Sequence, residues 1–129
     1  MTQRSIEVEG LGHGSVPIPM ACRVGPLLIS GGINGKEVGT GKLPEDMDAQ
    51  VRNAFANMKR VLEAADMALT DVVKVTVFLA DEGDRNAVNG PWTEVYPDPA
   101  HRPARHALVM PLRGGARIQL EVTAYATEA

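Results

Sequence analysis

The chain has 129 residues, of which 44% are hydrophobic and 22% are charged, a composition that predicts one globular domain spanning residues 1–129. Its net charge of −3 argues against a general nucleic-acid binder, because such proteins neutralise many phosphates. A single cysteine, the lack of a membrane-length apolar run and a start without a signal-peptide pattern favour a cytoplasmic protein that binds no membrane.

Short apolar segments predict three strands at the start of the chain. They include Ile6 and Val8, then residues 20–23, then residues 27–30. Gly25-Pro26 separates the last two segments and is typical of a hairpin turn.

Residues 46–68 are expected to form a long amphipathic helix. Pro44 and Asp46 suit its start, and polar residues occupy most of the remaining surface. Apolar residues recur at steps of three and four along one face, which indicates packing against a sheet. These residues are Met47, Val51, Ala54, Phe55, Met58, Val61, Leu62 and Ala65.

The second half of the chain predicts one strand, a short helix and two further strands. Residues 73–79, 105–110 and 117–126 alternate in hydrophobicity, as strands do. Residues 85–96 have helical spacing, with a kink or a new start at Pro91. The expected fold is an α/β (α+β) sandwich of order β-β-β-α-β-α-β-β, a mixed sheet with two helices packed on one face.

The last two strands are predicted to form an antiparallel hairpin around the turn at residues 111–115. A hairpin centred near Arg113 places Arg105 opposite Glu121, on a sheet face that the helices leave bare. It likewise places Ala107 opposite Gln119 and Val109 opposite Arg117. This pairing admits two interpretations, an exposed cross-strand ion pair or a ligand site covered by another subunit.

Cofactor and metal motifs are missing from the sequence. No glycine-rich segment has the spacing of a phosphate or dinucleotide loop. His13, His101 and His106 lack metal-ligand spacing. We therefore predict that the protein requires neither metal nor cofactor.

Several motifs together resemble the RidA/YjgF family of enamine/imine deaminases, also called the YjgF/L-PSP endoribonuclease family. The segment Arg102-Pro103-Ala104-Arg105 precedes Leu120-Glu121 by about fifteen residues, as in that family. The resemblance also covers Ile29-Ser30-Gly31-Gly32, the helix at residues 50–65, the strand at residues 71–79, and Val88-Asn89.

The resemblance implies catalytic roles for two residues: Arg105 would bind a substrate carboxylate, and Glu121 would position the attacking water. A guanidinium presents a bidentate fork to a carboxylate, and a carboxylate near it stays ionised. The resemblance also implies a chorismate-mutase-like homotrimer, whereas the bare sheet face alone indicates only more than one copy. The residues expected to contact substrate are Ser30, Gly31, Asn89, Ala107 and Gln119.

The family pattern is altered around the expected site. Val16-Pro17-Ile18-Pro19 stands where a tyrosine is expected, and His106-Ala107 follows the arginine in place of a small residue and a cysteine. The leading hypothesis is a deaminase that hydrolyses small carboxylate-bearing imines and enamines to keto acids and ammonia. The alternatives are a pathway-specific deaminase of a larger unsaturated amino acid, such as an aminomuconate, and a non-catalytic binder of small carboxylates.

Overall fold

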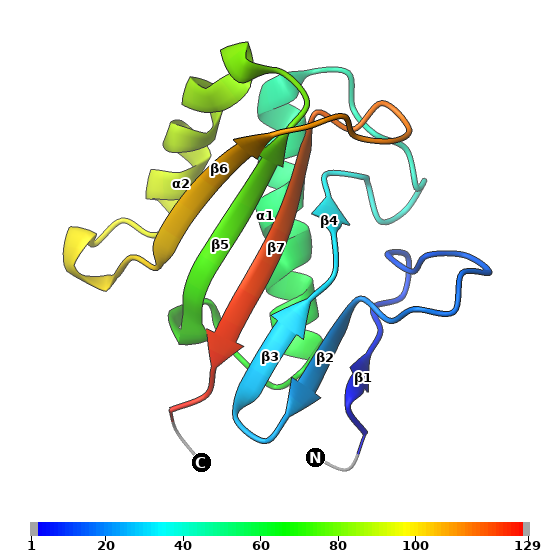
Figure 1. Ribbon diagram of the computed structural model, residues 1–129, viewed down its shortest axis with the longest axis vertical. Helices are drawn as coiled ribbons and strands as arrows, with labels where there is room; N and C mark the ends of the chain where they lie inside the picture. The colour runs from blue at the N-terminus through cyan, green and yellow to red at the C-terminus, as the bar shows by residue number, and fades with distance from the viewer. Residues whose placement is uncertain (1–2, 128–129) are drawn as a thin grey trace.

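The computed structural model describes residues 3–127, so the four end residues of the predicted domain lie outside the described residues. In this range a seven-stranded sheet carries the helices α1 and α2 on one face (Figure 1). The strands are β1 (Ser5–Ile6), β2 (Ala21–Val24), β3 (Leu27–Ser30), β4 (Ile33–Asn34), β5 (Val72–Leu79), β6 (Ala104–Val109) and β7 (Ile118–Tyr125). The helices are α1 (Met47–Ala64) and α2 (Asn89–Val95), with short 3-10 helices η1 (Leu69–Asp71), η2 (Glu82–Val88) and η3 (Pro99–His101).

The predicted fold class is confirmed, with local differences in several elements. The long helix ends at Ala64, four residues before the predicted end, and Val8 lies outside β1. Strand β4 was not predicted, because two residues are too few to show alternation. The second helical segment is divided into η2 and α2, and α2 begins at Asn89, two residues before Pro91. Proline is tolerated in the first turn of a helix, where backbone N–H groups have no intrahelical partner.

Helix α1 packs its apolar stripe on the sheet. The side chain of Asp46 caps the helix by accepting a hydrogen bond from the backbone N–H of Ala49. Val51, Met58 and Leu62 are fully buried in the core that α1 shares with β5 and β7. Near its start the helix lies so close to the loop after β4 that a Cβ at Gly35 would overlap the backbone of Gln50.

The strand order is β1-β2-β3-β7-β5-β6, and it contradicts the predicted hairpin of the last two strands. β7 pairs antiparallel with β3 and with β5, whereas β6 pairs parallel with β5 at the sheet edge. The two strands therefore have β5 between them. In the centre of the sheet β7 packs beneath α1, which buries the apolar side chains of Leu120 and Val122. β6 lies at the sheet edge, where most of its residues are exposed.

This order also corrects the expected pairing of Arg105 with Glu121. Residues opposite each other on paired strands share a sheet face. Buried Val75 is opposite both Arg105 and Val122, so Arg105 is on the helix-bearing face. Thr76 is opposite Glu121, which therefore lies on the other face.

The same rule separates the other residues expected on the bare face. Ala107 and Val109 are opposite Val77 and Leu79, on the helix-bearing face, whereas Gln119 is opposite Phe78, on the face of Glu121. Val109 and Arg117 are accordingly not partners, and Arg117 instead forms an ion pair with Asp84.

The face of the sheet away from the helices, which we call the open face, carries exposed apolar side chains. Register places on it Val24, Leu27, Ile29, Leu108 and Tyr125, which are between 40% and 54% exposed. The neighbouring strands β2, β3 and β7 contribute the first three and Tyr125, and β6 contributes Leu108. Exposed apolar surface of this kind is typical of an interface.

Candidate functional site

A hollow of about 190 Å³ lies between η2, α2 and the edge strand β6. We call it the β6 hollow. Its lining residues are Val77, Arg85, Asn86, Val88, Asn89, Arg105 and Ala107. Three predicted site residues, Arg105, Asn89 and Ala107, thus meet in one place.

Arg105 is held in the β6 hollow by neutral groups. Its Nη2 donates a hydrogen bond of 2.6 Å to Oδ1 of Asn89. Its guanidinium carbon lies 5.0 Å from the ring centre of Trp92, a cation–π contact. No carboxylate among residues 3–127 forms an ion pair with Arg105.

Burial lowers the pKa of Arg105 below its ordinary value, because the charged form is partly removed from water. An arginine nevertheless remains protonated in proteins. With one N–H engaged by Asn89, the other donors of the fork are left to bind an anion.

Packing beneath Arg105 explains its fixed position. Trp92 lies one turn after Asn89 on α2 and is buried against Phe55 and Tyr96, with ring centres 6.1 Å and 5.1 Å away. The Tyr96 hydroxyl donates a hydrogen bond of 3.0 Å to the carbonyl of Leu69. The tryptophan is therefore both a core residue and the aromatic base of the candidate site.

Ser30 and Gly31 lie at the end of β3, away from the edge strand β6 in the strand order. The buried Ser30 hydroxyl accepts a hydrogen bond from the Val122 backbone and donates one to the Gly31 carbonyl. The Gly31 N–H donates to the carbonyl of Met20. Ser30 is thus used to join β3 to β7, and Gly31 presents an exposed backbone beside it.

Gln119 and Glu121 are two residues apart on β7, and both lie on the open face. The Gln119 side chain packs on Gly32, because a Cβ there would lie 2.7 Å from the Gln119 amide. Glu121 is half-buried, and its carboxylate forms no hydrogen bond or ion pair with any residue from 3 to 127. The structure therefore divides the predicted site residues into Arg105, Asn89 and Ala107 in the β6 hollow, and Ser30, Gly31, Gln119 and Glu121 on the central strands.

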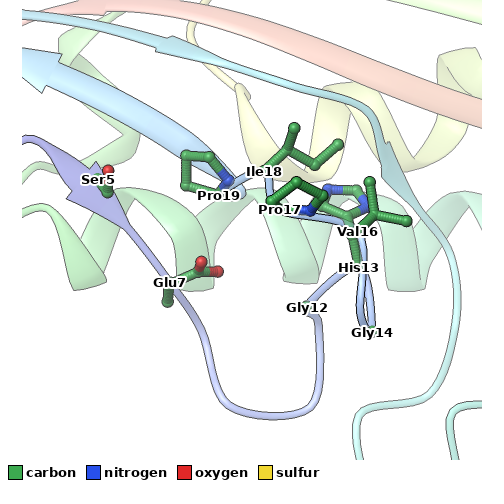
Figure 2. Close-up of a pocket in the computed structure, with 9 residues that line it drawn as sticks. All are labelled: Ser5, Glu7, Gly12, His13, Gly14, Val16, Pro17, Ile18 and Pro19. Carbon is green, nitrogen blue, oxygen red and sulfur yellow. The ribbon is translucent and has the colours of Figure 1, made fainter.

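The loop after β1 borders a second hollow, of about 440 Å³ (Figure 2). Val16, Pro17 and Ile18 line it in place of the tyrosine expected at that point. The Glu7 carboxylate and the Ser5 hydroxyl lie on its other side, as Figure 2 shows. Nε2 of His13 is buried and has no hydrogen-bond partner in the described part of the chain.

Arg85 and Asn86 line the β6 hollow but were not among the predicted site residues. One signal could have indicated Arg85: it precedes the expected site residue Asn89 by four positions, one helical turn, within a segment predicted to be helical.

No group of three His, Cys, Asp or Glu side chains between residues 3 and 127 could hold a metal ion. None of the helices described there has the length and hydropathy needed to span a membrane.

A family model described as "Endoribonuclease L-PSP" matches residues 18–128. Over 123 residues the chain is 30% identical to the "2-iminobutanoate/2-iminopropanoate deaminase" of Salmonella typhimurium, covering 94% of this chain and 96% of that protein. The enzyme of the same name from Escherichia coli strain K12 matches with the same identity and coverage.

Solved structures agree with this match. The structure of the YjgF gene product of Escherichia coli is 28% identical in sequence and has a TM-score of 0.85. The match covers 95% of this chain and 98% of that protein. The structure of a putative endoribonuclease from Thermotoga maritima is 27% identical in sequence and has a TM-score of 0.88. The match covers 98% of this chain and 100% of that protein.

Proposed function

The chain belongs to the endoribonuclease L-PSP family, and from that membership we propose that it is a hydrolytic deaminase without a cofactor, acting on small carboxylate-bearing imines and enamines. The observation that carries the proposal is Arg105, a fixed guanidinium that lines a hollow and has no carboxylate partner among the described residues. Relatives named as 2-iminobutanoate/2-iminopropanoate deaminases support the same chemistry.

Arg105 is proposed to bind the substrate carboxylate through the donors that Asn89 leaves free. Asn89 and Trp92 keep the fork in place, so little side-chain freedom is lost on binding. Such imines hydrolyse slowly in water unaided, so fixing the substrate beside an oriented water supplies much of the required catalysis.

Glu121 is proposed to orient that water. Its carboxylate accepts a proton as the water oxygen attacks the imine carbon, giving a carbinolamine. The C–N bond then breaks with proton transfer to nitrogen, and the products are one keto acid and one ammonia per water consumed. The absence of a hydrogen-bond partner for this carboxylate in residues 3–127 supports its availability for the role.

Arg105 and Glu121 lie on opposite sheet faces, so we propose that two copies of the chain form each site. The Glu121 face of one copy would meet the Arg105 edge of the next, and Ser30, Gly31 and Gln119 would come with Glu121. The family resemblance implies three copies, which would close such a ring as a homotrimer. This arrangement would also cover the apolar side chains of the open face.

Two other functions have specific support. The separation of Arg105 from Glu121 within one chain favours a binder of small carboxylates that uses Arg105 alone. Pro17 and Ala107, where the family carries larger or reactive groups, favour a deaminase of a larger unsaturated amino acid such as an aminomuconate.

Nucleic acid is not a proposed partner, since the net charge is −3. The proposed compartment is the cytoplasm, where the single Cys22 would stay reduced.

The test is the hydrolysis of imines generated in situ from alanine and 2-aminobutyrate by an amino-acid oxidase. Arg105→Ala should lower kcat/KM by about 100-fold, because a bidentate charged contact is lost. Glu121→Gln should abolish turnover yet retain binding of pyruvate, followed by calorimetry. Glu63→Gln, an exposed carboxylate on α1, is the matched control and should behave as the wild type.

Equal rates for Arg105→Ala and the wild type would refute the site. Pyruvate binding that depends on Arg105, without any acceleration of imine hydrolysis by the wild type, would establish the binder instead.

A further inference from the structure

A second arginine shares the β6 hollow with Arg105. Arg85 belongs to η2, and its Nε donates a hydrogen bond of 2.5 Å to Oε1 of Glu82. Its two Nη groups have no hydrogen-bond partner among residues 3–127, and 44% of its side chain is exposed. Arg85 therefore offers free donors to a molecule in the hollow.

Acidic side chains near the hollow do not neutralise both arginines. Asp84 is engaged by Arg117, whose Nη2 lies 2.9 Å from Oδ1 and 3.1 Å from Oδ2. Asp81 accepts from the backbone of Gly83. Glu82 is paired with Arg85, but its side chain is 69% exposed. Two guanidinium groups thus line one small space, and of these three carboxylates only the exposed Glu82 forms an ion pair with either of them.

The remaining lining suits a short carbon chain. Val77, Val88 and Ala107 are apolar, and Asn86 and Asn89 are neutral. A hollow of about 190 Å³ corresponds to the volume of roughly six water molecules in the liquid. A compact ligand with an anionic group at each end would fill it and would relieve the repulsion between the two cations.

We infer that the β6 hollow selects substrates with two carboxylates, Arg105 binding the one beside the imine carbon and Arg85 binding the distal one. This inference rests on the proposed deaminase function. It identifies the substrate class as imines and enamines of short dicarboxylic amino acids.

The test compares imines generated in situ from aspartate and glutamate with the imine of alanine. The measured quantity is the ratio of kcat/KM for the dicarboxylate to that for the monocarboxylate. Arg85→Met should lower this ratio by about tenfold, the value of one charged hydrogen-bonded contact, and Arg85→Lys should retain part of it. Arg113→Met removes an exposed arginine from the turn before β7 and should leave the ratio unchanged.

The outcomes separate this inference from the proposed function. If Arg105→Ala hydrolyses every imine as fast as the wild type, the proposed function fails. If Arg105→Ala loses activity while Arg85→Met keeps the wild-type ratio, only the second carboxylate site is refuted. Equal losses on both substrates in Arg85→Met, with an unchanged urea unfolding curve, would also refute it.

Discussion

Gly31 has no steric reason within its own chain to be glycine. A Cβ there would lie 3.7 Å from the nearest backbone atom, an ordinary contact, and its φ is not positive. Its backbone is exposed beside Ser30. An external molecule approaching that backbone would supply the missing reason.

We therefore predict that Gly31→Ala retains or slightly raises the free energy of unfolding, by up to about 1 kcal/mol, while lowering kcat/KM for imine hydrolysis. Urea unfolding and steady-state kinetics measure the two effects. Gly39→Ala, with no atom within 4 Å of its Cβ, should affect the free energy of unfolding to a similar extent but leave the kinetics unchanged. Full activity in Gly31→Ala would show that no substrate approaches this glycine during the reaction.

At the level of single residues, the family motifs indicated candidate site residues, but the sequence alone could not predict where all of them lie. Arg105, Asn89 and Ala107 come together as the motif implied. Ser30 has a structural use that its motif did not indicate, because its hydroxyl satisfies the Val122 N–H on a distant strand. Arg85 was missed because a charge in a short helical segment is usually on a solvated surface.

Among the elements, α2 is fixed to the segment before β5 by the buried Tyr96, whose hydroxyl bonds to the carbonyl of Leu69 in η1. Burial raises the pKa of Tyr96 above its ordinary value of 10.0. Above that pH the unfolded chain loses the phenolic proton and the folded chain keeps it. The unfolded state then binds fewer protons, so stability falls as pH rises.

We predict that Tyr96→Phe lowers the free energy of unfolding at neutral pH by about 1 kcal/mol, through loss of the hydrogen bond. Above about pH 10 the free energy of unfolding of Tyr96→Phe should fall less steeply with pH than that of the wild type. The difference in slope should be about 1.4 kcal/mol per pH unit, the contribution of one bound proton. Urea unfolding across the alkaline range measures both slopes. Identical slopes in the two proteins would show that Tyr96 titrates normally.

The sequence pattern located the longer strands, and β3 has the predicted bounds of residues 27–30, whereas β4 was too short to show alternation. Strand neighbours were not predictable in the same way. The turn at residues 111–115 indicates a reversal of the chain, but the same reversal occurs whether the strands pair or have β5 between them. One inserted strand was enough to move Arg105 to the face opposite Glu121.

For the whole molecule, the exposed apolar side chains of the open face lead to a prediction about assembly. Ile29 is 53% exposed and lies opposite Thr123 on the central strand. A charge buried there against another copy would lack a partner, so Ile29→Glu should dissociate the assembly. Sedimentation equilibrium should give about three chain masses for the wild type and one for the variant.

Ala56→Glu adds the same charge on the exposed side of α1, in the other layer, and should sediment like the wild type. The Ile29→Glu protein should also lose imine hydrolysis if each site needs two copies. A monomeric Ile29→Glu variant with full activity would refute a site shared between subunits.

The central place of β7 has a consequence for biosynthesis. β7 joins β3, β4 and β5, yet it follows all three in the chain. At a translation rate of ~5–20 residues per second, β3 has waited on the order of ten seconds when β7 emerges from the ribosome. Until β7 emerges, the edge of β3, and that of β5 once β5 has been made, have unfilled hydrogen-bonding positions, and apolar Leu28 and Val75 lack the strand that completes their layer. The nascent chain is therefore most open to aggregation just before β7 emerges, when chaperone cover matters most.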